Sequence, residues 1–423
     1  MTTTKNNEHK KLNFSSEREQ SQVCLNSAEH EKNQGRKVLN VPNLRFPEFQ
    51  GEWEKSKLSD LCTFFSGGTP SSSNKDFYGG DIAFIRSGEL HANSTELFIT
   101  QDGYDNSSAK KVEIGDLLLA MYGATSGDIA VSKIRGAINQ AILCIRTNQN
   151  KKFIESVWNK HVSKILRKYL QGGQGNLSAD IVKGISFSFP TLEEQKRIAN
   201  LISLLDERIA TQNKIIEDLK KLKSAIIDYA INSLNTDFAK LGSLYEMAGE
   251  GGTPTTSNAS FYDNGKIPFI KIDDLKQKYL TENKDFITEL GLQKSSAWLV
   301  PTHSILFSNG ATIGEISITT YPVCTKQGIL GIVPKQNIDV EFLYYFMSSS
   351  YFKKAVSRIV TEGTMKTAYL KDINNILCPI PTKEKQQEIA KMPSALNSKI
   401  DFEQSILKLF CSQKQHLLRQ MFI

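Results

Sequence analysis

The chain carries one twelve-residue motif twice, and this repetition limits its possible folds more than any other feature. The segment 67–78 reads GGTPSSSNKDFY and the segment 251–262 reads GGTPTTSNASFY, so eight of the twelve positions are identical. Repeats that stack into solenoids recur every ~20–50 residues. The spacing here is 184 residues, which is the length of a domain with its connector. The sequence therefore predicts two copies of one domain.

Further matched segments place both copies on one plan. Gly123–Gly127 matches Gly310–Gly314, and Asn139–Ile142 matches Lys326–Ile329, each at a spacing of 187 residues. Short apolar runs punctuated by Gly and Asn are typical of strands. Such runs lie at 82–85, 116–121, 129–131, 141–145 and 267–270. We predict two similar domains of α+β or α/β class, over 41–190 and 235–381.

One helix is expected in the first domain, over 152–170. Five residues share a face there at helical spacing: Phe153, Val157, His161, Ile165 and Tyr169. The segment around 342–346 is its counterpart in the second domain.

Each domain is followed by a connector with a seven-residue apolar period. The connectors 191–234 and 382–423 align at a constant spacing of 191 residues. Their seams last more than four heptads, which favours a coiled coil over a simple amphipathic helix. The apolar seam residues are Ile198, Ile202, Leu205, Ile209, Ile216, Leu219, Ile226, Ala230, Ile389, Leu396, Ile400, Leu407, Phe410, Leu417 and Met421. We expect the two helices to pair antiparallel, as a pseudo-twofold strut of roughly 50 Å that joins the domains.

Polar residues interrupt the seams at matching places. Gln212 corresponds to Glu403, and Lys223 corresponds to Lys414. Polar seam residues can fix register and partner at a cost in stability. Alternatively, these long side chains reach out of the seam to water.

Two irregularities distinguish the second connector. Thr191 and Glu194 predict a capping box for the first helix, and Lys385 breaks the equivalent box in the second. Pro393 is expected to kink the second helix or to mark its effective start.

Bulk composition indicates a globular protein that stays in the cytoplasm. No apolar run approaches the ~20 residues of a membrane span, and the polar N-terminus lacks a secretory signal. Residues 1–40 are expected to be a disordered extension. A net charge of +7 permits a nucleic-acid partner without requiring one. The six cysteines form no Cys-x-x-Cys pair and are expected to be reduced: Cys24, Cys62, Cys144, Cys324, Cys378 and Cys411.

The ordered set of motifs resembles type I restriction-modification specificity subunits. The similarity rests on Leu44–Phe49 with Trp53, the two Gly-Gly-Thr-Pro segments, the two Gly-Ala-Thr-x-Gly turns, and Pro190–Gln195 leading into the first helix. It extends over 41–423 and implies two target-recognition domains, each of which reads half of a bipartite DNA site. The helices would set the gap between the half-sites. The resemblance also implies partners, namely two modification (methyltransferase) subunits and two restriction (translocase–nuclease) subunits. S-adenosylmethionine, ATP and Mg would belong to those partners.

Loop residues with polar or charged side chains are the candidates for reading bases and holding phosphates. Segments 86–89 and 271–274 follow matched apolar runs, yet their side chains differ, as expected of two domains that read different sequences. The DNA-contact candidates are Arg86, Ser87, Glu89, Lys110, Lys111, Lys133, Arg135, Gln171, Gln174, Asn176, Lys271, Asp273, Asp274, Thr364 and Lys366. Each of them has a plainer interpretation as a solvated surface residue.

The glycine motifs also have two interpretations. The Gly-Gly-Thr-Pro segments are either structural loops or donors of backbone N–H groups to DNA phosphates, and no Lys-Ser/Thr follows at the spacing of a nucleotide-binding loop. The Gly-Ala-Thr-x-Gly turns are explained by hairpins with glycines at positive φ, although contact with DNA is an alternative.

The chain lacks the Asn/Asp-Pro-Pro-Tyr/Phe segment of amino-methyltransferases and any Walker motif. We therefore predict a DNA-specificity subunit that is not catalytic by itself. The alternatives are a scaffold for partner subunits with weak DNA reading of its own, a degenerate copy, and an enzyme with a disguised site.

Overall fold

The computed structural model describes residues 39–169, 177–310, 312–360 and 366–423. By packing, the chain divides into two units, which are described separately. The first comprises residues up to 200 together with 417–423, and the second comprises 201–416. The first domain lies in the first unit, and the second domain lies in the second unit with most of both long helices. The expected extension over 1–40 falls almost entirely outside the described residues.

The first domain is built around two four-stranded sheets. One has the order β2 (Cys62–Ser66), β9 (Ile142–Thr147), β6 (Leu117–Ala120), β7 (Ile129–Val131). The other has the order β4 (Phe98–Ile99), β3 (Tyr78–Ile85), β8 (Gly136–Ile138), β5 (Lys110–Val112). A separate pair joins β1 (Glu54–Lys57) to β10 (Ser186–Phe189). The helices are α2 (Leu58–Leu61), α3 (Gln101–Asp105), α4 (Lys151–Tyr169) and α5 (Ala179–Gly184).

The second domain repeats this plan with one strand added and with the counterpart of β5 reduced to the bridge between Val300 and Val323. Its larger sheet has the order β12 (Tyr245–Glu250), β19 (Ile329–Pro334), β16 (Ile305–Ser308), β17 (Ile316–Thr319), β14 (Tyr279–Leu280). The smaller sheet has the order β15 (Asp285–Ile287), β13 (Ile267–Ile270), β18 (Cys324–Thr325), and β11 (Phe238–Lys240) pairs with β20 (Leu377–Pro379). The helices are α7 (Glu289–Gln293), α8 (Val340–Ser348), α9 (Ser350–Ile359) and α10 (Leu370–Ile373). The added strand β14 runs parallel to β17 in a longer loop that has no counterpart in the first domain.

Matched apolar cores explain why diverged sequences adopt one fold. The central strands β6 and β16 are buried along their whole length, as expected for strands covered on both faces. The helix α4 buries Phe153, Val157 and Ile165 on one face, as its periodicity predicts, while Tyr169 is exposed. Its counterpart is broken into α8 and α9, because Ser349 ends one helix and caps the next by accepting a bond from Phe352 N.

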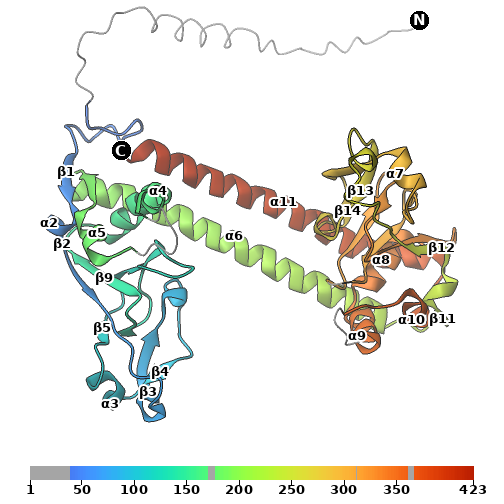
Figure 1. The fold of residues 1–423 in the computed structure, drawn as a ribbon, viewed down its shortest axis with the longest axis horizontal. Helices are drawn as coiled ribbons and strands as arrows, with labels where there is room; N and C mark the ends of the chain where they lie inside the picture. The colour runs from blue at the N-terminus through green and yellow to red at the C-terminus, as the bar shows by residue number, and fades with distance from the viewer. Residues whose placement is uncertain (1–38, 170–176, 311, 361–365) are drawn as a thin grey trace, which may run out of the picture. The chain divides into compact units, whose positions relative to one another are not determined.

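The connectors form two long helices, α6 (Leu192–Asn232) and α11 (Lys383–Met421). Within the second unit they lie side by side and antiparallel (Figure 1), because Asp206 pairs with Lys414 while Lys223 pairs with Asn397. The helix α11 runs through Pro393, so the expectation that this proline marks the helix start is wrong. Proline has no N–H to donate within a helix, and Pro393 is buried.

The helix starts differ from the predicted caps. Thr191 Oγ1 accepts from Glu194 N at 3.4 Å, but the Glu194 carboxylate bonds to Arg45 and Trp53 rather than closing the box. Thr382 Oγ1 accepts from Lys385 N at the same 3.4 Å. Both threonines therefore cap their helices equally. The charged side chains three residues later pair elsewhere, Glu194 with Arg45 and Lys385 with Glu388.

Over the described ranges, no helix is long and apolar enough to span a membrane. The described cysteines Cys62, Cys144, Cys324, Cys378 and Cys411 are free thiols. Burial raises the pKa of Cys144 to about 12 and that of Cys324 to about 11, so these thiols behave as small apolar groups.

Candidate nucleic-acid interface

In the first domain, two parallel strands end side by side and bring together loops that are distant in sequence. Strand β3 pairs with β8, with Phe84 opposite Ala137 and Ile85 opposite Ile138. Asn139 N donates to Ile85 O at 3.2 Å, immediately beyond the last pair. The carboxyl ends of parallel strands share one sheet edge, so the loops that begin at Arg86 and at Asn139 emerge together. We call this edge the strand-end face.

The Gly-Gly-Thr-Pro segment closes one side of the strand-end face by close backbone packing. A Cβ atom on Gly67 would lie 1.8 Å from Ile138 O, and one on Gly68 would lie 2.0 Å from Ser108 Oγ. These approaches require glycine and explain the motif as a structural loop. Thr69 Oγ1 hydrogen-bonds to the Gln140 side chain, so the loop also orients a polar residue on the face.

The second domain repeats the arrangement atom for atom at several points. A Cβ on Gly251 would lie 2.2 Å from Thr325 O, and Lys326 N donates to Ile270 O at 2.9 Å. Gln327 N donates to Thr253 Oγ1 at 3.4 Å. The same framework therefore presents Asn139 with Gln140 in one domain and Lys326 with Gln327 in the other.

The predicted reading segments 86–89 and 271–274 lie at equivalent places on this face. Arg86 N donates to Glu89 Oε2 at 3.0 Å, and Lys271 N donates to Asp274 Oδ2 at 2.9 Å. The shared backbone contact is combined with different side-chain pairing. Arg86 binds its own Glu89 at 2.9 Å, whereas Lys271 binds Asp285 at 2.7 Å.

The Arg86–Glu89 and Lys271–Asp285 ion pairs place charged side chains at the strand-end face. Hydrogen bonding to Arg86 lowers the pKa of the Glu89 carboxyl, despite partial burial. Ser87 lies within the same 3-10 turn, Ser87–Glu89, and Asp273 lies within Ile272–Asp274. The two turns thus present a cation and a carboxylate each at the same spacing of three residues, but with different side-chain pairing.

The lysines of β5 border the strand-end face in the first domain only. Lys110 lies opposite Ile138 and Lys111 opposite Ala137, and both side chains are exposed. Lys111 also lies over the Tyr104 ring, 4.6 Å from its centroid. The second domain has Trp298 and Leu299 at the corresponding positions before the Val300–Val323 bridge. This edge is basic in one copy and apolar in the other.

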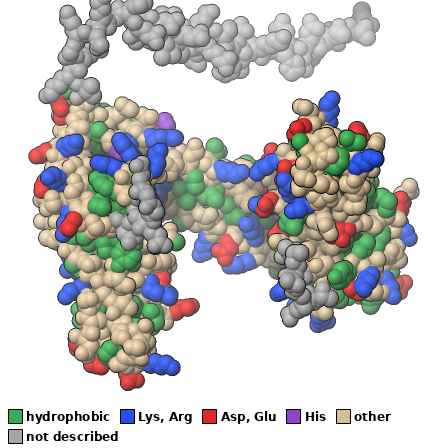
Figure 2. Space-filling view, viewed as in Figure 1, with side chains coloured by type: hydrophobic (Ala, Val, Ile, Leu, Met, Phe, Trp, Pro, Cys, Tyr) green, Lys and Arg blue, Asp and Glu red, His purple; other side chains and the backbone are tan. Residues whose placement is uncertain are grey.

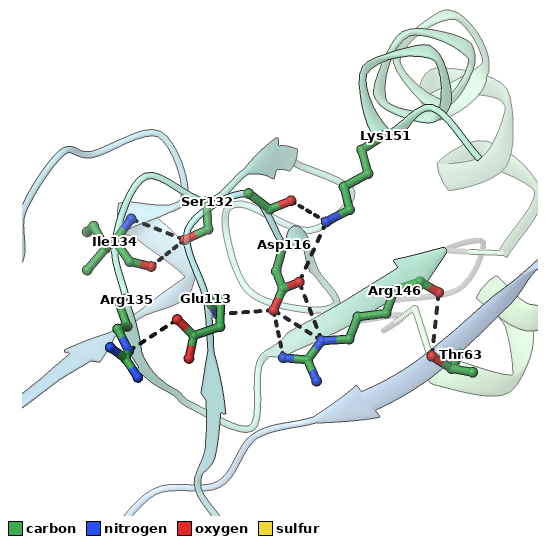
Figure 3. A network of polar contacts seen from close by, with 9 residues as sticks. Thr63, Glu113, Asp116, Ser132, Ile134, Arg135, Arg146 and Lys151 are labelled. Atoms are coloured by element: carbon green, nitrogen blue, oxygen red, sulfur yellow. Dashed lines mark hydrogen bonds and ion pairs between the residues drawn. The ribbon is translucent and has the colours of Figure 1, made fainter. Parts of the chain in front are cut away.

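The remaining phosphate candidates, Lys133 and Arg135, lie at the opposite end of the sheet. They follow β7, beside Ser132 and Glu113, and Arg135 Nε lies 3.1 Å from Glu113 Oε2 (Figure 3). Sequence reasoning grouped them with Arg86, but the strand directions separate them. Through Glu113, Arg135 joins the surroundings of a buried carboxylate, Asp116.

At the end of the sheet opposite the strand-end face, the Asp116 carboxylate contacts several charged and polar groups. Its carboxylate accepts from Arg146 Nη2 at 2.8 Å and from Glu113 N at 3.0 Å, and Lys151 Nζ lies 3.7 Å away (Figure 3). Burial acts to raise the pKa of the Asp116 carboxyl, but these partners outweigh burial and hold its pKa below the ordinary range. This network is structural, because it lies away from the strand-end face.

The glycine turns lie next to the strand-end face. Gly123, Gly127 and Gly314 adopt positive φ, as expected for hairpin turns, whereas Gly310 does not. Gly310 instead lies close to another glycine, because a Cβ atom placed on it would lie 3.3 Å from the Cα of Gly328. His91 Nε2 lies 2.9 Å from Asp128 Oδ1 and thereby links the segment after Arg86 to the first turn.

Residues that follow two further predicted reading segments, 171–176 and 361–366, bond to the backbone beside the glycine turns. Leu177 N donates to Met121 O at 2.8 Å, and Ala368 N donates to Asn309 O at 2.9 Å. Lys366 is exposed and lies two residues before Ala368. The candidates Gln171, Gln174, Asn176 and Thr364 lie outside the described residues.

Sequence reasoning missed Gln140, Lys326, Gln327 and His91 as candidates for the strand-end face. For three of these residues a signal was present in the sequence, because Gln140, Lys326 and Gln327 lie in the matched segments Asn139–Ile142 and Lys326–Ile329. Among the described residues, no group of three or more His, Cys, Asp or Glu side chains could hold a metal ion.

The helix seams are the second functional feature. All predicted apolar seam residues are buried or half-buried. The last turns differ from the predicted heptads, because Ile227 and Ile231 insert into the core of the second domain beside Phe342 and Leu343. Phe422, the counterpart of Ile231, packs against Phe153 of the first domain with ring centroids 5.2 Å apart.

Comparison with known proteins agrees with this fold. The family described as the type I restriction modification DNA specificity domain matches residues 50–221 and again 235–409. The chain therefore belongs to this family of specificity subunits. Its two halves are the two copies of the family domain, and the long helices join them.

Two of the similar proteins match most of the chain, and a third matches about a quarter of it. The MjaIX specificity subunit of Methanocaldococcus jannaschii is 24% identical over 383 residues, covering 82% of this chain and 88% of the relative. The HindI specificity subunit of Haemophilus influenzae is 35% identical over 115 residues, covering 27% of this chain and 25% of the relative. The S subunit structure from M. genitalium has a TM-score of 0.56 at 16% identity, covering 90% of this chain and 99% of that one.

Proposed function

We propose that each domain of this specificity subunit reads one half of a bipartite DNA site through its strand-end face. One observation carries the proposal. The backbone framework of the face recurs in both domains, while its charged side chains differ, with Arg86 and Glu89 in one and Lys271 and Asp274 in the other. A common scaffold with different hydrogen-bonding groups is what two different half-sites require.

We further propose that phosphate attraction supplies most of the affinity. Lys110 and Lys111 border the face in the first domain, and Lys366 lies near it in the second. Such contacts release counterions, so affinity should fall steeply as salt rises. Lys133 and Arg135 are assigned no base contact, because they lie at the other end of the sheet.

The long helices are proposed to set the gap and to dock modification subunits. Hydrophobic side chains lie on the surface of the long helices (Figure 2). The exposed apolar residues there, which a monomer would leave in water, include Leu204, Ile215, Leu222, Phe402 and Leu409. Ile215 and Leu222 are seven residues apart, which suits a partner helix. We propose two modification and two restriction subunits in the assembly, with S-adenosylmethionine, ATP and Mg bound by those partners.

The test is a domain exchange in the assembled methyltransferase. Residues 60–185 are replaced by the equivalent segment of another specificity subunit, and methylated adenines are mapped across a genome. One half of the recognised sequence should change while the other half and the gap persist. A change in both halves, or in neither, would contradict the assignment of one half-site to each domain.

The alternative proposal is a scaffold that holds partner subunits and reads DNA weakly by itself. The same complex distinguishes the two, because a scaffold would support assembly without sequence-dependent methylation. The pure chain alone is expected to methylate nothing, and methyl transfer by it would indicate a site of its own.

A further inference from the structure

In the first unit, an extended arm covers the groove between the start of α6 and the end of α11. The arm comprises residues 44–49. Leu44 N donates to Gln420 O at 2.9 Å, which ties the arm to the last turn of α11. The ring of Phe46 lies beneath the Arg197 guanidinium, 5.4 Å from centroid to Cζ. An aromatic side chain thus fills the groove while its neighbours contact the helices.

Two ion pairs fix the arm in this groove. Arg45 binds Glu194 with contacts of 2.7 Å, and the Glu194 side chain is only 1% exposed. Glu48 lies 3.8 Å from Arg197. A basic residue of the arm therefore faces an acid on α6, and an acidic residue of the arm faces a base one turn later.

Among the described residues, no segment covers the equivalent groove in the second unit. At the constant spacing of 191 residues, Leu201 corresponds to Met392 and Tyr229 corresponds to Gln420. Tyr229 and Met392 line a hollow of about 490 Å³ together with Ile226 and Ile389. Tyr229 is 77% exposed and Met392 is 59% exposed, although side chains of this kind are normally covered when they gather at one place.

The chain itself explains why no arm fills this groove. The first domain is preceded by the extended arm, whereas the second is preceded by α6. The helix ends at Asn232 and β11 begins at Phe238, so only 233–237 connects them, and part of this segment already forms the groove wall. The second domain thus has no segment of its own that corresponds to 44–49.

Charges at the open groove are the reverse of those at the covered one. Lys385 stands where the first helix has Glu194, and Glu388 stands where it has Arg197. Lys385 and Glu388 pair with each other at 2.9 Å and are both exposed. The arm of a second copy would bring Arg45 to Lys385 and Glu48 to Glu388, which places like charges together.

We propose that this groove binds an extended segment of a partner protein that resembles the arm with its charges exchanged. The segment carries an aromatic side chain for the surface formed by Tyr229 and Met392. An acidic residue precedes the aromatic one and pairs with Lys385, and a basic residue follows it and pairs with Glu388. The inference concerns a protein interface and does not depend on how the chain reads DNA.

The test uses the full chain and two labelled peptides. One has the sequence of residues 41–50, and the other has the same sequence with the residues at the Arg45 and Glu48 positions exchanged to Glu and Arg. By fluorescence anisotropy, the exchanged peptide should bind about tenfold tighter than the natural one, since each ion pair replaces a like-charge contact. The double variant Lys385→Glu/Glu388→Arg recreates the first groove and should reverse this preference.

Two single variants check that the groove is the site. Met392→Lys should weaken both peptides, whereas Leu290→Lys, at an exposed apolar position of α7 outside the groove, should change neither. Matching circular dichroism spectra establish that the variants fold. An unchanged preference in the charge-reversed chain, insensitivity to Met392→Lys, or no binding of the exchanged peptide at millimolar concentration would overturn the proposal.

Discussion

Gln212 contacts Glu403, the residue that occupies its own position in the other repeat. The Gln212 side-chain amide donates to Glu403 O at 3.1 Å and also to the Glu403 carboxylate. Equivalent residues meet only where a local twofold axis crosses the helix pair. Lys223 reaches Asn397 at 3.0 Å on one side of this axis, and Lys414 reaches Asp206 at 2.5 Å on the other. The two contacts are related by the twofold axis, because Asp206 and Asn397 occupy one position of the repeat and Lys223 and Lys414 occupy another.

The polar seam residues therefore satisfy one another across the helix pair, which favours a role in register over simple reach to solvent. Gln212→Leu should leave Glu403 partly unpaired and lower the unfolding midpoint by roughly 2–4 °C. Gln212→Leu/Glu403→Leu should recover the midpoint or exceed it, since an apolar pair suits the seam. Thermal unfolding measures both. If the double variant unfolds below the single one, the pair is needed for stability as well as for register.

Two buried serines, one just before β16 and one at its end, offer a matched comparison of hydrogen bonding. Ser304 Oγ has no hydrogen-bond partner among the described residues, while Ser308 Oγ accepts from Glu315 N at 2.8 Å. Both side chains are fully buried. Ser304→Ala should be neutral or stabilise by up to about 1 kcal/mol, and Ser308→Ala should destabilise by about 1–2 kcal/mol. Denaturant unfolding gives both values, and equal effects would contradict the assignment of partners.

The duplication could be predicted from the sequence because it depends on long matched segments. Repetition at a constant spacing of 191 residues requires no knowledge of contacts, and burial of the seams follows from the heptads. Strands such as β13 were also predictable, because apolar runs of β-branched and aromatic residues suit buried sheet.

The composition of the strand-end face was not predictable from local pattern. Thr69 meets Gln140 across 71 residues, and only the parallel pairing of β3 with β8 brings their loops together. The same pairing places Lys133 and Arg135 at the far end, although their charge resembles that of Lys110. Charge pattern identifies candidates, whereas strand direction decides which of them share a surface.

The Asp116 network should make stability depend on pH. Because the folded pKa of Asp116 lies below its usual value, its contribution is present above about pH 4 and is lost as pH falls through the folded pKa. Asp116→Asn should cost about 1 kcal/mol at neutral pH, a modest value because Arg146 is 45% exposed and solvent weakens the pair. Unfolding measured from pH 7 to pH 3 should show the two proteins converge in acid. A constant difference across this range would mean that the carboxylate charge is not what stabilises the fold.

The two glutamines at the strand-end face give the most direct test of half-site reading. Gln140→Ala should relax discrimination at one base of one half-site by about 1–3 kcal/mol, and Gln327→Ala should do so in the other half-site. Each change leaves the framework glycines and the spacer intact, so the gap should persist. Lys133→Ala serves as the control, because Lys133 is equally polar but lies at the opposite end of the sheet, and it should leave both half-sites unchanged. Methylation of a randomised-site library by the assembled complex measures all three, and relaxation of both half-sites by one glutamine variant would contradict separate reading by the two domains.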